Sequence, residues 1–111
     1  MENVVQVASN HYSPLLSAVT ATGAGSTYKK PATKCSFQAY GTTTAGAGAA
    51  TITVEVSNDG TNWLTMGTIT LTLSTTAAND GFTSDSPWTN VRGNVTAISG
   101  TGASVTLTMG W

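Results

Sequence analysis

Few residues of this chain carry side chains suited to acid–base or nucleophilic chemistry. There is one histidine, His11, one cysteine, Cys35, and five carboxylates at Glu2, Glu55, Asp59, Asp80 and Asp85. His11 and Cys35 would form a nucleophilic pair only if the fold joined them, and the sequence offers no third group to orient the imidazole. We therefore expect a buried structural cysteine, a surface histidine and no enzyme activity.

The segment SNDGTN, residues 57–62, contains oxygen ligands of the kind that bind calcium. It lacks the alternating acidic residues and distal glutamate of an EF-hand, and Asp59-Gly60 is a dipeptide that strongly favours a hairpin turn. Asp80-Gly81 is a second turn signal of the same kind. The segment GAGAA, residues 46–50, lacks the Lys-Ser/Thr pair of a phosphate-binding loop. The sequence therefore predicts turns, with no metal and no cofactor.

Three tryptophans, Trp63, Trp88 and Trp111, are the side chains best suited to binding a ligand. An exposed indole ring gives a flat platform on which a sugar ring can stack, and β-sandwiches often bind carbohydrate in this way. The alternative is that Trp88 and Trp111 pack in the core. Interface and core uses of tryptophan are both commoner than sugar binding, so sugar binding is the secondary hypothesis.

Length and composition predict one small domain, residues 1–111, with residues 1–8 as a candidate N-terminal arm. Only 8% of the residues are charged and the net charge is -1, which argues against nucleic acid as a partner. The 22 threonines and 11 serines supply the polar surface instead. The chain shows no secretory signal and no apolar run of membrane-spanning length, and a single cysteine allows folding in a reducing cytosol.

The elements that position these residues are predicted to be strands. No window has the 3.6-residue apolar period of a helix, whereas two-residue alternation of apolar and polar residues recurs along the chain. Seven or eight short antiparallel strands predict an all-β sandwich. The alternating ranges are Val4–Ala8, Leu15–Thr20, Cys35–Tyr40, Thr51–Val56, Trp63–Met66, Thr68–Leu73, Trp88–Ile98 and Ser104–Met109.

Residues 51–74, TITVEVSNDGTNWLTMGTITLTLS, are expected to form a hairpin. A two-residue turn at Asp59-Gly60 would mix polar and apolar residues on each face. A three-residue loop, Asn58 to Gly60 with a left-handed glycine, separates the faces and is preferred. In that register Ile52 lies opposite Met66 and Val54 opposite Leu64, and the outer face carries Trp63 beside Glu55 and Thr65 beside Thr53.

Beyond Met66 the alternation reverses, which predicts a bulge or corner at Gly67. The last two strands are expected to pair around a loop at Thr101. The low-complexity stretches 20–33 and 41–50 are predicted to be loops or extended arms. In the expected C-terminal pairing Ala97 lies opposite Val105, Val95 opposite Leu107, Gly93 opposite Met109, and Val91 faces Trp111.

Two segments are candidates for contact with a partner. Lys29-Lys30, followed by Pro31, would either bind carboxylates of a partner or protect a sheet edge, and the second interpretation is preferred. The N-terminal valines are apolar on both faces of a strand, which favours pairing with a second copy (a dimer) or another surface, although they are equally suited to an ordinary first strand. The candidate interface residues are therefore Val4, Val5, Val7, Trp63, Lys29 and Lys30.

The C-terminal segment PWTNVRGNVTAISGTGASVTLTMGW, residues 87–111, together with VEVSNDGTNW, residues 54–63, resembles small structural proteins of tailed bacteriophages. The pattern is most similar to capsid decoration proteins (cement or staple proteins) of short-tailed, epsilon-fifteen-like phages. This resemblance implies a jelly-roll-like β-sandwich that binds the major capsid protein and stabilises the shell. It implies a location on the outer capsid surface of the virion, after synthesis in the bacterial cytoplasm.

Two other functions are compatible with the sequence. One is a phage tail or fibre sandwich that binds host-surface carbohydrate, for which Trp63 is the expected contact. The other is a generic immunoglobulin-like adhesion module. The SNDGTNW hairpin also occurs in discoidin-like sugar-binding sandwiches, so this segment alone does not separate the alternatives.

Overall fold

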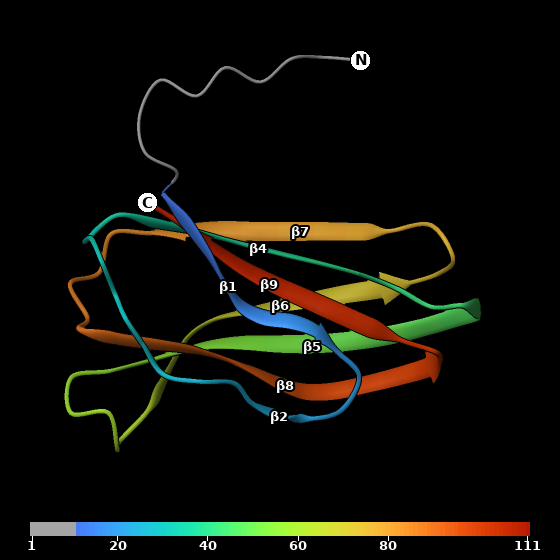
Figure 1. Cartoon of the computed structure of the whole chain (residues 1–111), viewed down its shortest axis with the longest axis horizontal. Coiled ribbons are helices and arrows are strands. Elements are labelled where there is room, and N and C mark those ends of the chain that lie inside the picture. Colours follow the sequence, from blue (N-terminus) through green and yellow to red (C-terminus); the bar gives the residue numbers. More distant parts are fainter. Residues whose placement is uncertain (1–10) are drawn as a thin grey trace, which may run out of the picture.

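The computed structural model describes residues 11–111, which form an antiparallel β-sandwich (Figure 1). One sheet has the strand order β1-β9-β4-β7, and the other has the order β2-β8-β5-β6, with β3 also paired to β8. The predicted fold class is confirmed. The strands are β1 (Tyr12–Val19), β2 (Gly23–Ala24), β3 (Tyr28–Lys29), β4 (Cys35–Thr42), β5 (Ala45–Ser57), β6 (Leu64–Leu73), β7 (Ala78–Ser84), β8 (Asn90–Thr101) and β9 (Ser104–Gly110).

The alternation of threonine with aliphatic residues explains the two layers. In β6, for example, Ile69, Leu71 and Leu73 are buried while the intervening threonines are exposed. Because successive strand residues point to opposite faces, each sheet has one apolar inner face and one hydroxyl-rich outer face. The inner faces meet in one core, formed mainly by Ile52, Val54, Val56, Ile69, Leu71, Leu73, Val91 and Val95 from one sheet and Leu15, Leu16, Phe37, Ala39, Val105, Leu107 and Met109 from the other.

Several predicted strand boundaries were wrong. Residues 45–50, expected in a loop, begin β5, and Asp80-Gly81, expected in a turn, lies in the middle of β7. Backbone pairing explains both: β5 lies between β6 and β8, and β7 pairs along its whole length with β4, which outweighs the weak strand propensity of the small residues. The Val4–Ala8 prediction lies outside the described residues.

The predicted register of the β5–β6 hairpin was also wrong. Val56 pairs with Leu64 and Glu55 with Thr65, so the connection is longer than three residues. Gly60 does adopt the expected left-handed conformation, with φ of 74°. The predicted bulge next to Gly67 is confirmed: Val54 pairs with Gly67 and Glu55 with Thr65, which leaves Met66 as the extra residue. One continuous strand, β6, thus replaces the two that were expected.

The predicted pairing of the last two strands was wrong, because β8 and β9 belong to different sheets. The turn at Thr101 therefore connects the two layers. Gly93 still faces large residues, but they lie across the core: an added Cβ would come within 2.8 Å of side-chain atoms of both Leu107 and Leu16. The small residue makes room for the opposite layer, as packing of interlocking side chains requires.

Three loops and both ends of the described chain meet at one end of the sandwich, at the left in Figure 1. The loops are residues 30–34, 58–63 and 85–89. His11 and Trp111 lie beside each other at the same end, where the Trp111 backbone N–H donates to the His11 carbonyl over 3.0 Å. We call this end, with its three loops and adjoining strand ends, the loop end.

Candidate binding surface

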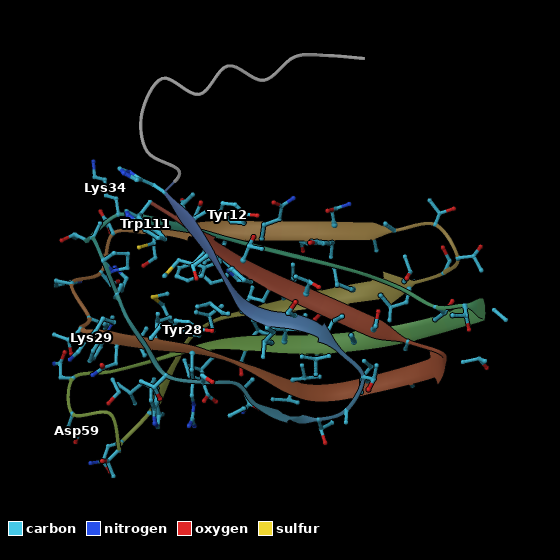
Figure 2. All side chains as sticks on the ribbon, in the orientation of Figure 1. Tyr12, Tyr28, Lys29, Lys34, Asp59 and Trp111 are labelled. Atoms are coloured by element: carbon cyan, nitrogen blue, oxygen red, sulfur yellow. The ribbon has the colours of Figure 1, made fainter. Side chains whose placement is uncertain are left out.

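Most of the charged residues and all three tryptophans of residues 11–111 lie at the loop end. Figure 2 shows Lys29, Lys34, Asp59 and Trp111 at this end. Of the eight charged side chains within residues 11–111, Asp80 alone lies away from it, on edge strand β7. The remaining surface is mostly threonine, serine, alanine and glycine. The loop end is therefore the surface with the most varied means of recognising a partner.

Lys30 holds two loops of this surface together. Its Nζ donates to the backbone carbonyls of Ala32, Thr33 and Ser86 at 2.7, 2.6 and 2.7 Å. The three N–H groups of the ammonium are thereby used within the chain. Lys29 is exposed at the end of β3, opposite Asn90 of β8. Of the two candidate lysines, Lys29 is thus the one whose side chain is available to a partner.

Asp59 organises the 58–63 loop. Its Oδ1 accepts hydrogen bonds from the backbone N–H groups of Thr61 and Asn62 at 2.9 and 2.8 Å, and from the Ser57 hydroxyl at 2.8 Å. Its Oδ2 accepts from the Asn62 amide. The backbone and side-chain hydrogen bonds from Asn62, followed by those from Thr61 and Ser57, hold the pKa of Asp59 well below its ordinary value. The carboxylate therefore serves as an internal acceptor that fixes the loop.

Trp63 ends this loop against a polar cluster on the outer face of the five-stranded sheet. The Arg92 guanidinium lies 4.3 Å from the Trp63 ring centre, and its Nε donates to Glu55 Oε1 at 2.7 Å. Asn94 donates to the other Glu55 oxygen at 3.1 Å. Burial alone raises the pKa of Glu55, but hydrogen bonds from Asn94 and Arg92, with the Arg92 charge, outweigh burial and lower it. The expected position of Trp63 beside Glu55 in the hairpin register was wrong, because Glu55 pairs with Thr65, and Arg92 instead contacts both side chains.

Trp111 borders the larger of two hollows at the loop end. This hollow has a volume of about 650 Å³ and is lined by Lys34, Cys35, Ser36, Thr83, Ser84, Asp85, Gly110 and Trp111. Trp111 is 39% exposed and stacks on His11, with ring centres 5.9 Å apart and planes within 5°. The expectation that Trp111 packs in the core was therefore wrong. Trp111 follows β9 directly and lies outside the strand pairing of the sheet.

Trp88 lies between core and surface. It is half-buried and packs against the core cluster, as the core alternative predicted. It also borders the second hollow, of about 400 Å³, whose lining includes Lys29, Lys30 and Pro31. All three tryptophans therefore lie at the loop end, Trp88 and Trp111 beside the two hollows and Trp63 in the 58–63 loop. Their spacing in the sequence did not predict this.

The residues suited to nucleophilic chemistry have other contacts. Cys35 is buried, and its thiol donates to the Ala32 carbonyl at 3.3 Å, while His11 is exposed and stacks on Trp111. Within residues 11–111, no three His, Cys, Asp or Glu side chains gather where they could hold a metal ion. In the same part of the chain, no helix is long and apolar enough to span a membrane. The candidate interface residues Val4, Val5 and Val7 lie outside the described residues.

Comparisons with known proteins indicate the fold class. No protein-family model matches the chain, and no curated protein matches it. The fold is similar to that of the PBSX exported protein XepA, a phage-related protein known from a crystal structure, with a TM-score of 0.53 and 14% sequence identity. The similarity covers 96% of this chain and 39% of XepA, so the chain corresponds to well under half of that protein. At this identity the match shows a shared fold.

Proposed function

We propose that this chain is a structural protein of a bacteriophage virion that binds the outer surface of the capsid and stabilises the shell. The major capsid protein is its proposed partner, and the outer capsid surface its location after synthesis in the host cytoplasm. The observation that carries the proposal is the loop end, where three tryptophans and the exposed Lys29 and Lys34 lie together on an otherwise threonine-rich, weakly charged sandwich. Aromatic residues, tryptophan among them, are enriched at protein interfaces and often carry most of the binding energy.

Two further findings support a virion role without enzyme chemistry. The fold similarity to a phage-related protein favours a phage origin. The nucleophile and the imidazole of the chain are engaged separately, since the Cys35 thiol donates to a backbone carbonyl and His11 stacks on an indole. Binding through the loop end would depend on shape and aromatic contact, which suits a subunit repeated many times on one lattice.

The test is binding to shells. Purified chain should co-sediment in saturable amounts with undecorated capsids of a phage whose genome carries this gene, next to its major capsid gene. Lys29→Glu and Trp111→Ala should each weaken binding, because both side chains are exposed at the loop end. Thr75→Glu, which adds a carboxylate to the exposed β6–β7 turn, is the control and should bind as the unchanged chain does. Equal binding by all four proteins would exclude the loop end as the contact surface.

A second candidate is a tail or fibre protein that binds host-surface carbohydrate. The hollow beside Trp111 favours it, because an exposed indole adjoins the hydroxyls of Ser36 and Thr83 and the carboxylate of Asp85. A sugar ring can stack on such a platform while its hydroxyls bond to the polar lining. A glycan array decides: a signal that Trp111→Ala or Trp63→Ala abolishes, with no binding to shells, would replace the capsid proposal by this one.

A further inference from the structure

Three of the sheet edges carry features that discourage pairing with another strand. Edge strand β1 contains Pro14 and two register irregularities against β9. Edge strand β7 carries Asp80 opposite the buried Ala39, which places a charge on the inward-facing side of the edge. The strands β2 and β3 have two residues each, and β3 leads into Lys30-Pro31. Short edges, prolines, irregularities and inward charges are the usual means by which sheets avoid edge-to-edge association.

The fourth edge, β6, has none of these features over its regular part. It is ten residues long and contains no charged residue and no proline. After the bulge at Met66 it continues without irregularity from Gly67 to Leu73. One side of this segment pairs with β5, and within residues 11–111 no strand pairs with the other side. A row of backbone N–H and C=O groups is thus open to a further strand.

We propose that β6 is an interaction edge that pairs antiparallel with β6 of a second copy of this chain, about a two-fold axis at Thr70. Two-fold symmetric dimers are the commonest oligomers of soluble proteins. The pairing would join the two five-stranded sheets into one continuous sheet. It needs no capsid, so it goes beyond the proposed function and does not depend on it.

The sequence of β6 fits its own copy in this register. Thr70 lies opposite its counterpart, Thr68 opposite Thr72 and Ile69 opposite Leu71, so threonines meet on the outer face and aliphatic residues on the inner face. Gly67 then lies opposite Leu73, which means that the seven regular residues all find a partner. No like charges face each other, and threonine pairs across strands are favourable. A shift by one residue would place threonines against aliphatic side chains.

Measurement of mass in solution tests the pairing. Full-length chain should have twice the monomer mass by light scattering, and Thr70→Lys should have the monomer mass at the same concentration, because two lysines would meet at the axis. Thr27→Lys makes the same change in charge at an exposed residue near the opposite edge of the same sheet, between β2 and β3. This variant should remain dimeric. Circular dichroism and melting of each variant separate loss of pairing from loss of folding.

Disulfide trapping tests the register. Opposed residues in antiparallel strands have Cα atoms roughly 4.5–5.5 Å apart, within the range that a disulfide spans. Thr70→Cys should therefore give a covalent dimer on mild oxidation. Thr68→Cys should not, because residue 68 and its counterpart would be four residues out of register, about 13 Å apart. The native Cys35 is buried, so the unchanged chain is the background control.

Each outcome decides for or against the proposal. A dimer that Thr70→Lys disrupts and Thr70→Cys traps supports it. A monomeric unchanged chain overturns it, and so does a dimer that both lysine variants retain. Deletion of residues 1–10 tests the alternative that the N-terminal segment makes the dimer contact. If the deletion abolishes the dimer and Thr70→Cys fails to trap it, that alternative holds and pairing of β6 with itself is excluded. Shell binding is scored separately, on the same variants.

Discussion

Phe82 of β7 lies directly against Gly67 of β6, although the two strands belong to different sheets. A Cβ atom added to Gly67 would overlap the Phe82 ring, with Cζ nearest and the two Cε atoms at 2.8 and 2.9 Å. The Phe82 ring in turn packs on Phe37 of β4, with ring centres 5.3 Å apart. The absence of a side chain at Gly67 thus lets the two layers close at this edge of the core, beside the bulge at Met66.

Gly67→Ala should destabilise the fold by roughly 1–3 kcal/mol, because the new methyl group overpacks the contact with the Phe82 ring. The free energy of unfolding from chemical denaturation is the measurement. Phe82→Leu should reduce the cost of the same glycine substitution, since a smaller, more adaptable side chain can make room for the methyl group. Equal costs in the two backgrounds would show that the ring is not the obstacle.

Two aliphatic residues of β6 should respond very differently to truncation. Ile69 is 2% exposed and Leu64 is 58% exposed. Ile69→Ala should therefore cost about 2–5 kcal/mol of stability, and Leu64→Ala well under 1 kcal/mol. The hairpin register expected from the sequence gives the opposite result for Leu64, because it places that residue in the core. Denaturant unfolding of both variants distinguishes the two registers.

Lys30 and Lys29 are neighbours with different roles. Lys30→Met should lower stability by about 1–3 kcal/mol, because three backbone carbonyls lose a charged hydrogen-bond donor. Lys29→Met removes an equal charge from an exposed side chain and should change stability by under about 0.5 kcal/mol. Melting temperatures would decide, and similar losses in the two variants would contradict the assigned role of Lys30.

Acid should weaken the 58–63 loop through Asp59. The folded-state pKa of Asp59 lies below the ordinary value of 3.8, so the folded chain binds fewer protons than the unfolded chain in this range. The resulting stabilisation is complete above the ordinary pKa and is lost as the pH falls toward the folded pKa. Asp59→Asn keeps an oxygen acceptor but does not titrate, so its melting temperature should fall less between pH 6 and pH 2.5, in the range of carboxyl titration. Parallel pH profiles would argue against this account.

The sequence predicted the sandwich because apolar residues alternate with polar ones in β4, in β9 and in β6 after Gly67. It did not predict the strand partners. A turn such as Asp80-Gly81 was favoured on local grounds, but pairing of β7 with β4 overrides that preference. The β8–β9 connection illustrates the same limit, because a short turn can either close a hairpin or cross between layers, and only the packing of both sheets decides.

The candidate surface was predicted only in part. Trp63 and the lysine pair were identified from residue type, but the register that set Trp63 beside Glu55 was wrong. The sequence did not predict that Arg92 contacts both Trp63 and Glu55, because the position of Arg92 depends on the pairing of β5 with β8. The hollow beside Trp111 was missed for a similar reason. Lys34, Asp85 and Trp111 come from three separate parts of the chain, and the pairing of β4 with β7 and β9 in one sheet brings them together.

Electron cryo-microscopy of undecorated shells mixed with the full-length chain tests the proposed function most directly. If the chain is a capsid decoration protein, sandwich-shaped density should appear at symmetry-equivalent sites outside the shell, with the loop end facing the lattice. Shells mixed with Lys29→Glu should show weaker density at the same sites, and shells mixed with Thr75→Glu should match the unchanged chain. Bare shells at saturating concentrations of folded chain would contradict the proposal.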